Sequence, residues 1–225
     1  YKVGSGEVTN FLLLEKIART GKPIILSSGM SNYAELDAAI AFLRPFGNEL
    51  SVLQCTTAYP TPPERVGLNV LTELRARYPD LAAVGLSEHT AKVTTGIAAA
   101  ALGADILEFH AVFDRRMFGP DASSSLTIAE IKELVTAVRH VGTMLAHPID
   151  KTDNEAYTGL KAIFEKSLAV SRDLPTGHVL AFDDLEAKKP AGHGIPASQF
   201  REVLGRRLRG PLQQYDFLTA TDLED

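Results

Sequence analysis

Short apolar runs and amphipathic stretches alternate along the first 145 residues. Five runs of four to six residues are apolar almost throughout, as parallel strands are when both faces of their sheet are covered. They predict strands at 1–4, 23–27, 50–55, 82–87 and 106–110. Between them, apolar residues spaced three and four apart predict helices over 34–44 and 66–77. Ser31, Asn32 and Thr127 are candidate N-caps.

Repeated strand–helix units indicate a parallel α/β fold. Polar residues gather just after the predicted strands, and this carboxyl edge is where both barrels and open sheets bind ligands. Five units cannot close an eight-stranded TIM barrel, so a barrel requires about three further units upstream. We therefore expect the last five β/α units of a TIM (β/α)8 barrel, if the chain forms a barrel.

The pattern changes after residue 145. Residues 146–166 form a polar connector, and the chain beyond it has short β-like runs at 167–170 and 178–180. Turn residues lie between these runs, and the segment KKPAGHGIP follows them. We expect the barrel part over 1–145, a linker over 146–166 and a small α+β or mostly-β domain over 167–225.

Composition limits the possible functions without selecting one. In 225 residues, 45% are hydrophobic and 23% are charged, which is typical of a globular protein and not of a disordered or coiled-coil chain. A net charge of −5 gives no electrostatic support for a nucleic-acid or membrane partner. No apolar run is long enough to cross a bilayer, and the first residues lack a signal-peptide pattern. The single cysteine, Cys55, is expected in the core and suits the reducing cytoplasm.

The predicted strand at 106–110 carries an unusual polar face. Residues two apart share a face, so Ile106, Glu108 and His110 lie on one side, and apolar residues lie on the other. Burying an unpaired charge is costly. The face is therefore either the mouth of a ligand site or a buried Glu–His hydrogen-bonded pair, and the strand alone leaves both interpretations open.

His89 follows the neighbouring predicted strand. Because adjacent strands lie ~4.8 Å apart, His89 and His110 could share a cation. The other histidines are expected to be solvated; these are His140, His147, His178 and His193.

Three further groups could face the same edge. Lys2 and Ser5 place a cation and glycine-flanked amides at a strand end, which suits phosphate or carboxylate binding. Residues 56–62 form a proline-set loop with hydroxyl groups. The loop 114–121 could fold Asp121 back over the strand ends. The chain contains no Gly-rich nucleotide fingerprint, nucleophile elbow or cysteine cluster.

Six segments carry these residues in the order YKVGSGEVTN, GKPIILSSGM, CTTAYPTP, VGLSEHT, LEFHAVFDRRMFGPD and SLAVSRDLPTGHVLAFDDLEAKKPAGHGIP. In this order they resemble the N-acetylneuraminate (sialic acid) synthase family, which includes legionaminate and pseudaminate synthases. The resemblance implies a TIM barrel followed by an antifreeze-like (SAF) domain. It also implies condensation of phosphoenolpyruvate with an N-acylmannosamine-type sugar and water, giving a nonulosonic acid and phosphate.

The resemblance also implies roles for individual residues. His89 and His110 match ligands of a divalent cation, Mn²⁺ or Mg²⁺, and with Glu108, a carboxylate near the reacting carbons, they form the implied catalytic set. The residues that match substrate-binding groups are Lys2, Ser5 and Ser87 for phosphoenolpyruvate, and Tyr59 and Asp121 for the sugar. Thr57 and Lys189 stand at two further substrate-binding positions. The family usually forms a domain-swapped homodimer in which the small domain caps the neighbour's barrel.

Three departures from the family pattern leave alternatives open. Thr57 stands where relatives often have Asn, and Lys189 stands where an arginine of relatives reaches the sugar's acyl group in the partner subunit's site. Residues that the family places on the first three strands are absent. A non-catalytic fragment that binds sugar or dimerises is therefore the rival hypothesis, and another phosphoenolpyruvate–aldose condensing barrel is a weaker one. The acceptor sugar, N-acetylmannosamine or a diacetamido-trideoxy sugar, stays open.

Overall fold

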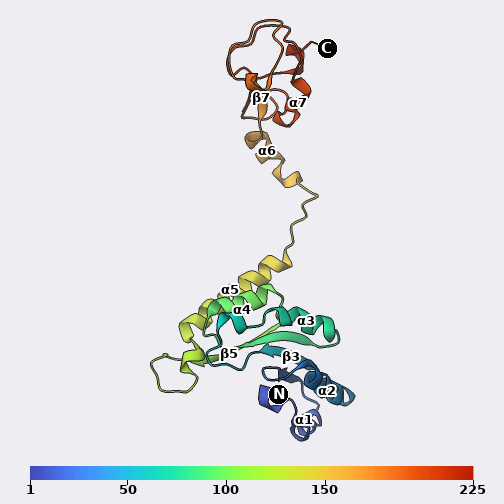
Figure 1. The fold of residues 1–225 in the computed structure, drawn as a ribbon, viewed down its shortest axis with the longest axis vertical. Helices are drawn as coiled ribbons and strands as arrows, with labels where there is room; N and C mark the ends of the chain where they lie inside the picture. Colours follow the sequence, from blue (N-terminus) through green and yellow to red (C-terminus); the bar gives the residue numbers. More distant parts are fainter. Residues whose placement is uncertain (225) are drawn as a thin grey trace. The chain divides into compact units, whose positions relative to one another are not determined.

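The computed structural model describes residues 1–224 (Figure 1). The chain divides into two compact units, Tyr1–Pro148 and the part that begins at Ile149. Among the described residues, no helix combines the length and the apolar character that crossing a bilayer requires.

Six parallel strands form the sheet of the first unit, paired in sequence order. They are β1 (Lys2–Val3), β2 (Ile24–Ser27), β3 (Leu50–Cys55), β4 (Ala83–Glu88), β5 (Ile106–Val112) and β6 (Ser125–Thr127). A sheet wound in one direction is the arrangement of a (β/α)8 barrel, whereas the strand order of a doubly wound sheet reverses at a switch point.

The prediction of five strands was wrong by one, because β6 pairs with β5 through His110 and Ser125. Three residues, of which only Leu126 is apolar, are too short to give a periodic signal. No α-helix separates β5 from β6, so the unit still has the five expected β/α units, and β6 is an extra short strand within the fifth.

Helices connect the strands (Figure 1). The α-helices of this unit are α1 (Phe11–Ala18), α2 (Tyr33–Leu43), α3 (Asn69–Arg77), α4 (Val93–Ala101) and α5 (Ile128–Ala146). Short 3-10 turns accompany them at η1 (Ser5–Glu7), η2 (Arg44–Phe46), η3 (Pro63–Arg65) and η4 (Ala122–Ser124).

Capping residues decide where two of the helices begin. Asn32 and Thr127 accept bonds from the third residue of α2 and α5, and the glutamate there bonds back in each case. These two predicted caps are confirmed, and Ser31 does not cap a helix. The helix predicted from residue 66 begins later, because Gly67 has φ +71°, outside the helical range.

The two faces of the sheet differ in polarity. Val3, Leu26, Val52 and Leu86 are at most 2% exposed and pack with the helices in one apolar core. Alternate strand residues point the other way. Cys55, Ser87 and Glu108 are in lateral register on that second face.

The second unit has little regular structure. In its described part, up to residue 224, one ladder pairs β7 (Ser167–Val170) antiparallel with β8 (Leu185–Lys188). Its other elements are η5 (Glu155–Tyr157), α6 (Thr158–Phe164), η6 (Phe182–Asp184), η7 (Ala197–Gln199), α7 (Phe200–Val203) and η8 (Ala220–Asp222). Leucines and valines of β7 and the loops form its core. The segment assigned to a linker thus contains a helix, α6.

Two expectations for the second unit were wrong. The run 178–180 forms an isolated bridge at Val179 and no strand, because the chain pairs there at one residue only. His178 is only partly solvated, since its side chain is 26% exposed and its Nε2 lies 2.7 Å from Oδ2 of the buried Asp184.

Candidate active site

A cavity of about 290 Å³ opens at the carboxyl edge of the sheet. Seven of the ten residues predicted for the site line it: Lys2, Ser5, Tyr59, Ser87, His89, Glu108 and His110. They come from β1, β4, β5 and the loops that follow β1, β3 and β4. The parallel arrangement gathers them because every strand ends at the same edge.

Glu108 forms an ion pair across the cavity. Its Oε2 lies 3.0 Å from Nζ of Lys2, on the first strand of the chain. Of the two interpretations left open for this face, the buried Glu–His hydrogen-bonded pair does not hold, because Lys2 takes the position next to the carboxylate. Both side chains are about one-third exposed, so solvent reaches them. A cation and a carboxylate thus stand side by side at the mouth of the cavity.

The two predicted metal ligands lie next to each other. The ring centroids of His89 and His110 are 5.1 Å apart. Nδ1 of the buried His89 is 3.0 Å from the carbonyl oxygen of Thr56. A carbonyl oxygen only accepts, so Nδ1 carries the proton and Nε2 keeps a free lone pair. On His110, Nδ1 lies 3.6 Å from Oδ2 of Asp121. The loop 114–121 therefore folds Asp121 back over the strand end.

This donor set fits a divalent cation with open coordination positions. A backbone carbonyl that orients the protonated nitrogen of His89 is the usual outer support of a metal-binding histidine. Imidazole suits borderline transition metals. Within residues 1–224, no three His, Cys, Asp or Glu side chains lie close enough together to hold a metal by themselves. Two imidazoles would leave the remaining positions to water and substrate.

Tyr59 lies against both histidines. Its ring centroid is 4.2 Å from that of His89 and 5.7 Å from that of His110. Burial, and then the charges of Cys55, Asp121 and Glu108, raise the pKa of Tyr59 above its ordinary value. The phenol therefore stays protonated at neutral pH and can donate a hydrogen bond to a ligand.

Gly29 is where the loops after β1, β2 and β3 meet. Its amide donates to Oγ of Ser5 at 3.0 Å, and a Cβ at this position would lie 2.5 Å from Oγ1 of Thr57. Glycine is needed for this close approach. Thr57 therefore contacts the glycine loop and does not line the cavity.

Lys189 belongs to the second unit, where its Nζ lies 4.6 Å from the centroid of the Phe164 ring. Sequence reasoning missed Cys55 and Ser27, which both line the cavity. The period of two along β2 and β3 could have found them, because it places both on the face of the sheet that carries Lys2 and Glu108.

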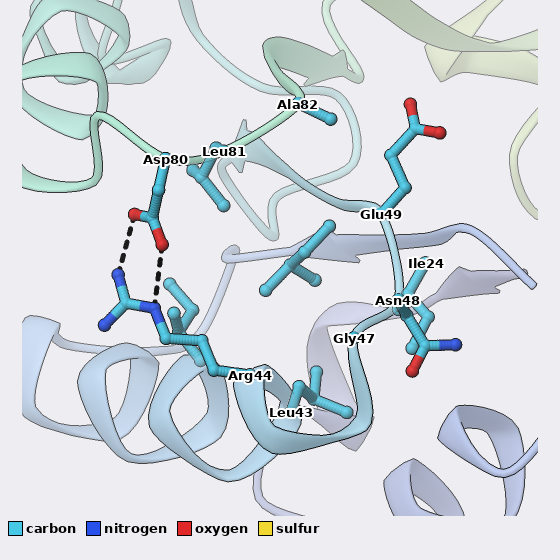
Figure 2. A pocket seen from close by; sticks show the side chains of 11 residues that line it. Ile24, Leu43, Arg44, Gly47, Asn48, Glu49, Asp80, Leu81 and Ala82 are labelled. Atoms are coloured by element: carbon cyan, nitrogen blue, oxygen red, sulfur yellow. Dashed lines mark hydrogen bonds and ion pairs between the residues drawn. The ribbon is translucent and has the colours of Figure 1, made fainter. Parts of the chain in front are cut away.

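A second cavity, of about 280 Å³, lies at the amino ends of the strands (Figure 2). Ile24 and Leu50, the first residues of β2 and β3, line it. Figure 2 shows Arg44 and Asp80 facing each other, with hydrogen bonds of 2.9 and 2.7 Å. Arg44 and Asp80 satisfy each other here, and this face of a barrel ordinarily serves stability.

Comparison with known proteins assigns the family. Residues 1–150 match the NeuB family, and residues 165–224 match the SAF domain. The chain belongs to the NeuB family. The expected fold class, part of a TIM barrel followed by an SAF domain, is confirmed.

Individual relatives agree with this assignment. The N,N'-diacetyllegionaminic acid synthase of Campylobacter jejuni is 36% identical over 92% of this chain and 61% of that protein. The N-acetylneuraminate-9-phosphate synthase of Homo sapiens is 34% identical over 96% of this chain and 60% of that protein. The crystal structure of N-acetylneuraminic acid synthetase from Leptospira borgpetersenii, in complex with citrate, is 26% identical with a TM-score of 0.64, over 71% of this chain and 55% of that one. The chain spans about three fifths of the length of these curated relatives.

Proposed function

We propose that this chain forms part of the catalytic site of a nonulosonic (sialic) acid synthase, a transferase of carbohydrate biosynthesis. The reaction joins phosphoenolpyruvate to an N-acylmannosamine-type sugar with addition of water, and it releases a nonulosonic acid and phosphate. The observation that carries the proposal is the convergence of Lys2, Glu108, His89 and His110 on one cavity in a NeuB family chain.

Lys2 would hold the phosphoenolpyruvate. Its ammonium group reaches the cavity from β1, and Ser5 and Ser87 add hydroxyl groups beside it. Phosphate and carboxylate oxygens accept hydrogen bonds from an ammonium and from hydroxyls. The ion pair with Glu108 keeps Lys2 aimed into the cavity before substrate arrives.

Glu108 would act at the pyruvyl carbon of phosphoenolpyruvate, the carbon from which phosphate leaves. As the C–C bond forms, positive charge develops on the pyruvyl carbon, water adds there and phosphate leaves. A carboxylate beside that carbon stabilises the charge and accepts a proton from the water.

His89 and His110 would hold Mn²⁺ or Mg²⁺ through ring nitrogens. Such an ion, when bound, polarises the aldehyde oxygen of the open-chain sugar. The Thr56 carbonyl keeps the His89 ring in the tautomer that can ligate.

Tyr59 and Asp121 would contact the acceptor sugar. Both flank the two histidines, one as an aromatic wall with a phenolic donor and the other as a carboxylate. Thr57 would act through the loop of Gly29. Lys189 would reach a neighbouring subunit's site in a domain-swapped homodimer, where it offers a point charge in place of the arginine fork of relatives. The same proposal places the reaction in the cytoplasm, where the free thiol of Cys55 stays reduced.

Phosphate release tests the proposal. Phosphoenolpyruvate, Mn²⁺ and either N-acetylmannosamine or a 2,4-diacetamido-trideoxy sugar are supplied to the 225-residue chain and to a form extended at its N-terminus to the length of its relatives. Glu108→Gln should lower kcat by on the order of 10²-fold or more. Glu49→Gln, at the opposite end of the strands, is the matched control and should change nothing. Activity in neither form with either sugar would refute the synthase and favour a non-catalytic binding module.

A further inference from the structure

Arg115 connects three segments around the candidate active site. It lies in the loop between β5 and η4 and is about one-third exposed. Its Nη2 donates to the carbonyl of Ala91 at 3.1 Å and to Oε2 of Glu130 at 2.7 Å. Its Nε donates to the carbonyl of Ser125 at 3.1 Å. One guanidinium thus joins the loop after β4, the start of β6 and the first turn of α5.

The bond to Ala91 holds the loop that carries His89. Ala91 follows His89 by two residues and has φ 55°, in the left-handed region that costs a non-glycine residue energy. From inside, Oε2 of Glu88 accepts from the amide and hydroxyl of Thr90 at 2.7 and 2.6 Å. Arg115 adds the outer contact, so the loop is fixed from both sides.

The bond to Ser125 holds the segment that carries Asp121. Ser125 is the register partner of His110, and its Oγ donates to the carbonyl of Asp121 at 2.7 Å. Arg115 therefore fixes the strand residue that supports both His110 and Asp121.

The bond to Glu130 fixes the guanidinium itself. Oε2 of Glu130 also accepts from the amide and hydroxyl of Thr127, at 2.8 Å each. The Thr127 amide, and with it Arg115, hold the pKa of Glu130 below its usual value despite partial burial. The carboxylate is thus ionised and locked in the cap of α5, which makes it a rigid support for Arg115.

We propose that Arg115 is a positioning residue that sets the placement of the His89 loop relative to the His110–Asp121 segment. It does not line the cavity, so it acts through these two segments. The effect on cation binding rests on the proposed function. The hydrogen bonds by which Arg115 joins the two segments do not depend on it. Three acceptors in different directions require the planar fork of arginine, and lysine offers a single point charge.

The test compares Arg115→Lys and Arg115→Ala with Arg116→Ala. Arg116 is the matched control, because its side chain is 90% exposed and bonds to Asp114 in its own loop. Hydrogen exchange is measured over residues 89–92 and 121–125, and Mn²⁺ affinity is measured from the electron paramagnetic resonance of the free ion. Both measurements use the chain extended to the length of its relatives.

We expect both Arg115 variants to speed exchange in the two segments and to weaken Mn²⁺ binding by about 10-fold or more. With phosphoenolpyruvate and sugar, kcat should fall while KM for phosphoenolpyruvate stays nearly constant, because Lys2 on β1 and Ser5 in η1 lie outside both segments. Arg116→Ala should match the wild type. A variant that misfolds would speed hydrogen exchange in β2 and β3 as well. In that case Glu130→Gln, which weakens one bond of Arg115 and keeps its side chain, is the milder change.

Wild-type exchange and Mn²⁺ affinity in Arg115→Lys would overturn the proposal. Failure of the proposed function has a different signature. A wild-type protein that binds Mn²⁺ and releases no phosphate would refute the synthase function. The positioning role of Arg115 would then still be tested by hydrogen exchange and Mn²⁺ affinity. A wild-type protein that binds no Mn²⁺ would overturn the role of Arg115 in cation binding.

Discussion

Replacing Asp184 should destabilise the second unit more than replacing any neighbouring acidic residue does. Its side chain is 1% exposed and accepts four hydrogen bonds. They come from Nε2 of His178 at 2.7 Å, from Nε and Nη2 of Arg172 at 3.0 and 2.6 Å, and from the Ala181 amide at 2.9 Å. Asp184 is also the residue directly before β8, and Lys189 directly follows that strand.

The pKa of Asp184 gives the magnitude. Burial alone would raise this pKa, but the bonds from His178, Ala181 and Arg172 outweigh burial and lower it from 3.8 to about 2. Since one pKa unit corresponds to about 1.4 kcal/mol, the ionised carboxylate stabilises the folded unit by about 2 kcal/mol. The folded-state pKa lies below the unfolded value, so this stabilisation is complete above about pH 5 and is lost as the pH falls towards 2.

Asp184→Asn should therefore lower the free energy of unfolding of the second unit by about 2 to 4 kcal/mol, because its donors lose a charged acceptor. Hydrogen exchange of the β7 amides at pH 7 measures this quantity for the second unit, and a loss of 2 kcal/mol speeds exchange about 30-fold. Asp183→Asn, at an exposed neighbour, is the control and should stay within about 0.5 kcal/mol.

The pH dependence of the second unit's stability separates a loss of charge at Asp184 from a loss of packing alone. Between pH 5 and pH 2.5 the wild-type unit should lose about 1.5 kcal/mol more stability than Asp184→Asn, whose side chain does not titrate. Equal losses in the two proteins, or a cost below about 0.5 kcal/mol at pH 7, would refute the reasoning.

Three further predictions concern the first unit. His89→Ala should weaken Mn²⁺ binding by about 10-fold or more in the free-ion resonance assay, and unchanged affinity would remove His89 from the cation site. Gly85→Ala should lower stability in chemical denaturation by about 1 to 3 kcal/mol, because its Cβ would lie 2.2 Å from the Ile106 carbonyl oxygen. Gly142→Ala, in open space on α5, should not lower it and is the control. Thr127→Ala should cost about 1 kcal/mol in the same assay through loss of the α5 cap, and no change would show that the cap is dispensable.

Local signals in the sequence were sufficient for most of the first unit. Continuous apolar runs located five of the six strands, and side-chain caps located the starts of α2 and α5. The period of two also placed Glu108 and His110 on the face of β5 that lines the cavity. These features depend on residues close together in the chain, so the sequence alone determined them.

Only the tertiary structure decided which distant groups meet. Lys2 pairs with Glu108 because β1 and β5 both contribute to one cavity, and no spacing in the sequence encodes that pairing. The same holds for Arg115, whose acceptors at Ala91, Ser125 and Glu130 come from three separate segments. Strand β6 is too short for a periodic signal and is defined by its pairing with β5. The bond between His178 and Asp184 spans six residues, but it forms only because the fold buries that carboxylate. Patterns along the sequence therefore determined the strands and the polarity of their faces, and packing decided the pairs that hold the site together.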